Sequence, residues 1–182
     1  MNVAARIDRL PAAWGTVLGA HAMWVFDKGG ALQSVQHALK YGDRPSYGVS
    51  LGKLLGVSYQ RAGWPNPDGV VPVPLHRLRL LERGYNQAEM LALGVAEPLE
   101  TEVLSGLLSR PRATRSQTNL SREARWANVA MAFEATRELD GGTYLIVDDV
   151  LTTGSTAMAC AQALRANGAD EVTIATLCLA RT

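Results

Sequence analysis

Hydrophobic residues along the chain form short continuous runs, separated by longer segments in which they recur at helical spacing. Continuous apolar runs of this length predict strands that are buried on both faces. The predicted strands are residues 21–26, 70–73, 144–147 and 172–179, with weaker candidates at 103–108 and 131–134. The predicted helices are residues 31–41, 46–62, 87–96 and 155–167. Alternating strands and helices predict an α/β fold with a mainly parallel sheet flanked by helices.

A cluster of proline, glycine and aspartate at residues 64–69 predicts a loop and a boundary within the chain. We expect a small N-terminal subregion of one strand plus helices over residues 1–66. Residues 67–182 then form the main part of the fold. The 182 residues are enough for one α/β domain of ordinary size with its own core.

Composition excludes several classes of protein. The formal net charge is +1, so overall charge predicts neither nucleic-acid nor membrane binding. No apolar run approaches the length of a membrane-spanning helix, and we expect a cytoplasmic protein without membrane insertion. The two cysteines, Cys160 and Cys178, fall in a predicted helix and a predicted strand. Buried thiols are therefore expected rather than a disulfide, and the chain has no zinc-ligand set.

The stretch Tyr144–Thr156 carries the clearest chemical signal in the chain. Its apolar strand runs into two carboxylates, Asp148 and Asp149, which we expect beyond the carboxyl end of the strand and facing a crevice. Ionised carboxylates accept hydrogen bonds, so the neighbouring hydroxyls of a ribose are matching donors. The same carboxylates could stabilise positive charge that develops on a sugar ring.

A turn rich in hydroxyl groups separates these acids from the next helix. Unpaired amides at a helix N-terminus favour an anion, and a glycine allows close backbone approach, so the turn predicts a phosphate cradle. Its residues are Thr152, Thr153, Gly154, Ser155 and Thr156. The alternative is an ordinary Ser/Thr helix cap beside two surface aspartates.

Two further stretches are rich in arginine. The first, Val71–Gln87, places a cationic loop after a predicted strand, on the sheet edge of the acid pair, where it would suit a pyrophosphate leaving group. Its candidate residues are Leu75, His76, Arg77 and Arg83. The alternatives are a solvated helix face for the arginines and a loop hydrogen bond, in place of general acid catalysis, for His76.

The second arginine-rich stretch, Arg110–Asn128, contains no acid before Glu123. It predicts a mobile basic loop that closes over a polyanion. A contact strip for nucleic acid, with Trp126 available for stacking, and a plain solvated segment are the alternatives. The loop candidates are Arg110, Arg112, Arg115, Ser116, Gln117 and Arg122.

Tyr144–Thr156 strongly resembles the phosphoribosyl pyrophosphate-binding motif of type I phosphoribosyltransferases, and further pieces resemble the ComF competence-protein family. Those pieces are LKYG at 39–42, VPVPLHR at 71–77, RGYNQ at 83–87 and SQT at 116–118, with Arg125, Asn128 and Phe133. The resemblance implies the type I phosphoribosyltransferase fold. Many relatives carry an N-terminal zinc ribbon built on cysteine pairs, whereas this chain has no cysteine before Cys160.

The resemblance also implies a function. Phosphoribosyl pyrophosphate would bind with Mg²⁺, without direct protein ligands to the metal, and phosphoribose would pass to a base or amine, a glycosyl transfer of nucleoside metabolism. The 5′-phosphate would bind to residues 152–156, and the ribose hydroxyls would bind to Asp148 and Asp149. The pyrophosphate would bind to residues 75–83, and residues 110–122 would cover it. Natural competence and DNA uptake are implied, with single-stranded DNA or competence-machinery proteins as partners; a homodimer is a further expectation. The alternative is a non-catalytic module that senses phosphoribosyl pyrophosphate or a nucleotide and binds single-stranded DNA, or a catalytically silent regulator.

Overall fold

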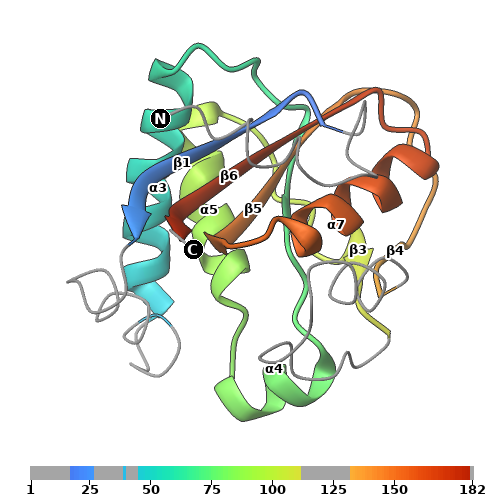
Figure 1. Cartoon of the computed structure of the whole chain (residues 1–182), viewed down its shortest axis with the longest axis horizontal. Helices are drawn as coiled ribbons and strands as arrows, with labels where there is room; N and C mark the ends of the chain where they lie inside the picture. Colours follow the sequence, from blue (N-terminus) through green and yellow to red (C-terminus); the bar gives the residue numbers. More distant parts are fainter. Residues whose placement is uncertain (1–16, 27–38, 40–44, 112–131, 181–182) are drawn as a thin grey trace.

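The computed structural model describes residues 17–26, 39, 45–111 and 132–180, and all structural statements concern these residues. Their main feature is a four-stranded sheet with the order β1–β6–β5–β2, in which all neighbours are parallel (Figure 1). The four strands are β1 (Gly19–Phe26), β2 (Gly69–Pro72), β5 (Thr143–Leu151) and β6 (Glu171–Ala180). The structure thus confirms the predicted α/β fold with a parallel sheet.

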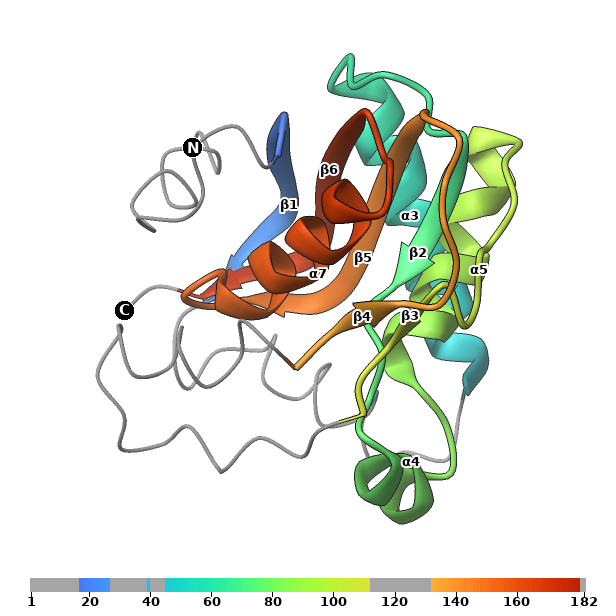
Figure 2. The same ribbon diagram turned by 90° about the vertical axis from the view of Figure 1, so that its right-hand side faces the viewer.

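Helices cover both faces of this sheet (Figure 2). The pair α3 (Pro45–Arg61) and α5 (Gln87–Leu99) packs on one face, and α7 (Ser155–Ala166) packs on the other. Residues 144–147 of β5 are all buried, because alternate side chains enter the two layers. Double coverage explains why continuous apolar runs located these strands in the sequence.

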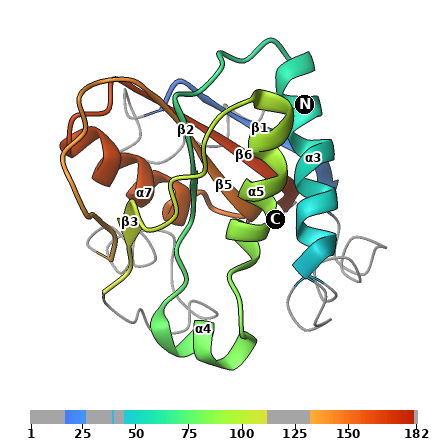
Figure 3. The same cartoon turned by 180° about the vertical axis from the view of Figure 1, so that it is seen from behind.

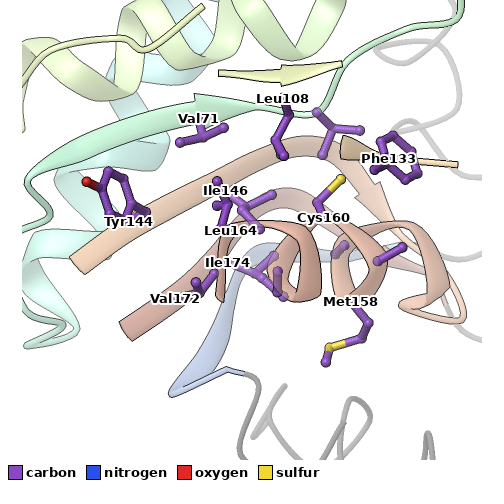
Figure 4. Close-up of a cluster of buried hydrophobic side chains, with 14 of the residues drawn as sticks. Val71, Leu108, Phe133, Tyr144, Ile146, Met158, Cys160, Leu164, Val172 and Ile174 are labelled. Atoms are coloured by element: carbon purple, nitrogen blue, oxygen red, sulfur yellow. The ribbon is translucent and has the colours of Figure 1, made fainter. Parts of the chain in front are cut away.

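The two layers enclose two hydrophobic cores. The first core lies under α7 and joins Ile146 and Ile174 of the sheet to Leu164 of the helix (Figure 4). Leu108 and Phe133 close one end of it. The second core lies under α3 and α5 and includes Leu145 and Ala175 from the same two strands. Consecutive residues of β5 therefore belong to different cores.

Glycine lines the contact between α3 and α5. A Cβ atom added at Gly52 of α3 would overlap the carbonyl oxygen of Leu91, and one added at Gly94 of α5 would overlap that of Val49. Gly48 and Gly56 lie one turn to either side on α3, where an added Cβ would come within 2.5 Å of Met90 Cβ and 2.6 Å of Pro98 Cγ of α5. The two backbones can approach this closely only because side chains are absent at these positions.

The weaker strand predictions were only partly right. In place of a strand over residues 103–108, the structure has an isolated bridge from Val103 to Val70 and then β3 (Leu108–Ser109), because a turn with Gly106 at φ 83° intervenes. The strand predicted at 131–134 lies slightly later, as β4 (Glu134–Ala135), antiparallel to β3. Apart from Leu39, the helix predicted at 31–41 lies outside the described residues.

The N-terminal part of the chain packs closely against the rest. Strand β1 pairs with β6 in the main sheet, and α3 packs along α5. The boundary at residue 66 stays a prediction.

Candidate functional site

Strand β5 continues through the acid pair. It pairs with β6 as far as Leu151, and Asp148 lies opposite Thr176 in this register. The expectation that both carboxylates follow the strand was therefore wrong, since Val150 and Leu151 extend the pairing beyond them. Successive side chains of a strand point to opposite faces, so Asp148 and Asp149 leave β5 in opposite directions. Both residues are partly buried.

Each carboxylate raises the pKa of a different cysteine thiol. Burial, and then the charge of Asp148, raise the pKa of the Cys160 thiol well above its usual range. Burial, and then the charge of Asp149, raise the pKa of Cys178 to about 11. Cys160 belongs to the first core and Cys178 to the second, which agrees with the opposite directions of the two acids. Both thiols are buried and not in a disulfide, as the sequence predicted.

The turn after β5 leads directly into α7. Gly154 occupies the cap position with a left-handed backbone, φ 82°, which glycine adopts without strain. The Thr153 and Ser155 hydroxyls lie 3.0 Å apart, and Thr153 Oγ1 accepts from the Ser155 amide at 3.4 Å. Ser155 is buried and Thr156 partly buried, whereas Thr152 is exposed. Gly154 makes no side-chain cap hydrogen bond, so the alternative of an ordinary Ser/Thr cap was wrong and the N-terminus of α7 favours an anion.

The predicted cationic loop contains a short helix that the hydrophobic pattern did not reveal, α4 (Arg77–Arg83). His76 is its N-cap, and its Nδ1 accepts from the Leu78 amide at 3.3 Å. This is the local hydrogen bond that the sequence offered as the alternative to general acid catalysis. No residue of α4 is buried, and the helix stands away from the sheet (Figure 3). Arg77 is exposed, and Arg79 forms an ion pair with Glu82 at 2.9 Å. Of the candidate residues in this loop, Leu75, His76 and Arg83 are partly buried.

Backbone pairing brings the start of α5 close to the acid pair. The Val73 amide donates to the Val147 carbonyl at 3.0 Å, and the Val73 carbonyl accepts from Asn86 Nδ2 at 3.0 Å. Asn86 is the N-cap of α5. The next residue, Gln87, is buried and accepts from Arg83 Nη1 at 3.1 Å. Gln87 was not among the site residues predicted from the sequence, although its position after the cationic loop and at a helix start was a usable signal.

Two of the ComF-like sequence pieces also meet here. The Tyr85 hydroxyl, from the RGYNQ piece, donates to the carbonyl oxygen of Leu39, from the LKYG piece. Leu39 is 1% exposed and belongs to the second core. This contact ties the N-terminal part of the chain to the segment between α4 and α5.

Arg110 lies beside the acid pair on the α7 side. Its guanidinium carbon is 5.2 Å from the centre of the Phe133 ring, within cation–π range. Burial lowers the pKa of Arg110, and Cys160 and Asp148 counteract that effect. Arg110 is therefore held against the first core near Asp148. The other loop candidates, Arg112, Arg115, Ser116, Gln117 and Arg122, lie outside the described residues.

The described residues contain no group of three or more His, Cys, Asp or Glu side chains that could hold a metal ion. Mg²⁺ often keeps several waters and binds through substrate phosphates, so a metal carried by a phosphorylated substrate would need no such group. The start of α7 could hold such a substrate by its phosphate. Among the described helices, none has the length and apolar character needed to cross a membrane.

Known proteins resemble this chain in sequence and in architecture. Residues 81–182 match the family described as the phosphoribosyl transferase domain. The DNA utilization protein YhgH of Escherichia coli K12 is 36% identical over 158 residues, which cover 85% of this chain and 70% of that relative. Competence protein F of Haemophilus influenzae is 34% identical over 111 residues, 59% of this chain and 48% of that protein. The glutamine phosphoribosylpyrophosphate amidotransferase from B. subtilis, complexed with ADP and GMP, superimposes with a TM-score of 0.52 at 26% identity, over 77% of this chain and 30% of that one.

Proposed function

Because the chain belongs to the phosphoribosyl transferase domain family, in its ComF competence-protein group, we propose that it binds phosphoribosyl pyrophosphate and transfers phosphoribose to a base or amine. The observation that carries this proposal is the succession at the end of β5, where the acid pair is followed within a few residues by the glycine-capped start of α7. Hydrogen-bond acceptors and an anion site in this order match the diol and the 5′-phosphate of one ribose phosphate.

Each part of the site then has a chemical role. The start of α7, residues 152–156, binds the 5′-phosphate, and Asp148 and Asp149 accept hydrogen bonds from the ribose hydroxyls. The bond from the anomeric carbon to pyrophosphate breaks, and its electron pair leaves with pyrophosphate. The acceptor nitrogen then forms the new bond to the anomeric carbon and loses its proton to solvent. Both carboxylates stabilise the positive charge that the sugar ring gains in between. Magnesium, when bound with the substrate, would neutralise charge on the leaving group.

Calorimetry with magnesium and phosphoribosyl pyrophosphate tests the binding site. Replacing both acids together, Asp148→Asn with Asp149→Asn, should weaken binding at least about tenfold, because two charged acceptors are lost. Asp140→Asn, at an exposed aspartate outside the site, is the matched control and should bind normally. Unchanged affinity in the double variant would refute the site.

Release of pyrophosphate tests turnover. The protein is incubated with phosphoribosyl pyrophosphate and magnesium, with and without a panel of bases and amines. Release that depends on one acceptor supports transfer and identifies the acceptor. Tight binding with no release under any condition would instead favour the non-catalytic sensing module.

The names of two relatives, DNA utilization protein and competence protein, favour a second candidate function. In this alternative the chain binds single-stranded DNA through the basic segment 110–126. Contacts to phosphates release counterions, so binding should weaken steeply between about 50 and 200 mM salt. Fluorescence anisotropy with a labelled oligonucleotide measures this. Binding that survives charge reversal at Arg112 and Arg115 would exclude the segment as the contact.

A further inference from the structure

Gln87, the first residue of α5, has a side-chain amide of which only the oxygen forms a hydrogen bond. Gln87 is 3% exposed, and its Oε1 accepts from Arg83. Its Nε2 has no hydrogen-bond partner among the described residues. A buried donor without a partner costs free energy, and folded proteins keep few of them. A ligand atom that accepts from Gln87 would remove this cost.

The neighbouring amide shows what a purely structural role looks like. Asn86 is also buried, at 8% exposed, but both ends of its side chain are satisfied. Its Nδ2 donates to the Val73 carbonyl, and its Oδ1 accepts from the Ala88 amide at 3.1 Å. Asn86 therefore fixes the start of α5 by itself. The helix start does not need the unused donor of Gln87.

The surroundings of Gln87 select the kind of ligand. The N-terminus of a 13-residue helix favours negative charge, and Arg83 adds a guanidinium at the same place. The amide Nε2 supplies donors and no acceptor. An oxyanion is the ligand that uses all three features. Val73 is hydrogen-bonded both to Asn86, the residue before Gln87, and to Val147, the residue before the acid pair. The ligand would therefore lie beside the candidate site.

We propose that Gln87 and Arg83 bind a phosphoryl group at the start of α5. The inference rests on the proposed function, in which this group is the pyrophosphate of phosphoribosyl pyrophosphate. It places the pyrophosphate against α5 and away from the outer arginines of α4. Arg77 is exposed on that helix, and Arg79 already pairs with Glu82.

The test replaces the amide with an apolar side chain of similar size, Gln87→Met. Calorimetry with three probes, phosphoribosyl pyrophosphate with magnesium, inorganic pyrophosphate and ribose 5-phosphate, separates the two ends of the substrate. We expect affinity for the first two probes to fall about tenfold or more, because a buried hydrogen bond to an anion is lost. Ribose 5-phosphate should bind as in the wild type. The melting temperature without ligand should change little, because removal of an unsatisfied donor offsets the loss of the hydrogen bond from Arg83 to Oε1.

Two further variants make the outcome decisive. Gln87→Glu keeps the size and the acceptor oxygen but replaces the donor with a negative charge, and should lose more affinity than Gln87→Met. Gln60→Met, at an exposed position of α3, should change nothing. The inference is overturned if the wild type binds phosphoribosyl pyrophosphate and Gln87→Met binds it equally well, or if ribose 5-phosphate binding falls in parallel. Failure of the wild type to bind phosphoribosyl pyrophosphate, with pyrophosphate binding still dependent on Gln87, would contradict only the proposed function.

Discussion

Asp148 and Asp149 are adjacent in the sequence but act on different cores: the charge of Asp148 raises the pKa of Cys160 in the first core, and that of Asp149 raises the pKa of Cys178 in the second. A ligand that engages both carboxylates must therefore reach across the strand. The two acids also have different neighbours, because Asp148 acts on the cation Arg110. The motif reads as a symmetric pair in the sequence, yet its members are not interchangeable in the fold.

The single variants Asp148→Asn and Asp149→Asn should therefore differ. Loss of the Asp148 charge removes one favourable interaction of the partly buried Arg110 guanidinium, so we expect a stability loss of about 1 kcal/mol, limited by solvent screening, as well as weaker ligand binding. Loss of the Asp149 charge should weaken binding with little effect on stability. It should also lower the pKa of Cys178 from about 11, because the carboxylate contributes to that shift. Urea denaturation and NMR titration of the cysteine Cβ measure these effects, and identical effects of the two variants would contradict the assignment of opposite faces.

The contact between Arg110 and Phe133 should be measurable as a coupling energy. A double-mutant cycle with Arg110→Met and Phe133→Leu isolates the interaction of the guanidinium with the ring from the loss of core packing. For a partly buried cation–π pair we expect a coupling of about 0.5–1 kcal/mol in urea denaturation. Arg110→Lys keeps the positive charge and should therefore retain part of the coupling energy. Additive effects of the two substitutions would show that the contact contributes nothing to stability.

The sequence predicted the sheet well because its strands are covered on both faces. Residues 144–147 form an apolar run for that reason, and the helix predicted at 155–167 matches α7 to within a residue. The pattern could not show that β5 continues through Asp148, because that extension depends on pairing with β6, which is distant in the sequence. It also missed α4, whose exposed Leu78 and Leu81 produce no buried stripe.

The remaining features depend on tertiary contacts. Glycine is a poor helix former, yet α3 contains Gly48, Gly52 and Gly56. Only the close packing of α5 against these positions explains them. The unused donor of Gln87 likewise becomes visible only when its burial and its partners are known. The parts of the site that follow one another along the chain were predictable from sequence. The parts brought together by packing were not.

Stability should depend on pH through His21. Its Nε2 lies 2.9 Å from Ser58 Oγ, and its ring meets Tyr59 edge-on. Burial lowers the pKa of His21 below the ordinary value of 6.5. The unfolded chain therefore takes up a proton first as the pH falls, and stability decreases below about pH 6.5.

The variant His21→Gln cannot titrate at this position and provides the comparison. Between about pH 7.5 and 5.5, the wild type should lose on the order of 0.5 kcal/mol more stability than the variant, a small amount because the ring is only partly buried. Urea denaturation at several pH values measures the difference. A difference between the two proteins that stays constant with pH would show that His21 carries no such linkage.

The crossing of α3 and α5 should tolerate no side chain at Gly52. By local propensity, Gly52→Ala ought to stabilise α3 by about 1 kcal/mol, since alanine is the better helix former. The added Cβ would overlap the Leu91 carbonyl and lie 2.9 Å from the Gly94 Cα, so the helices must move apart. Overpacking of this kind costs about 1–3 kcal/mol, and we expect it to exceed the propensity gain.

A control on the same helix separates the two effects. Ser50 is exposed on α3, and Ser50→Ala changes propensity without touching α5. It should raise the free energy of unfolding by a few tenths of a kcal/mol, to about 0.5 at most. Gly52→Ala should lower the free energy of unfolding. The backbone amides of α3 and α5, which cover the second core, should also be less protected in hydrogen exchange. If Gly52→Ala were as stable as Ser50→Ala, the helices would have room for a methyl group, and glycine could not be the reason for their close approach.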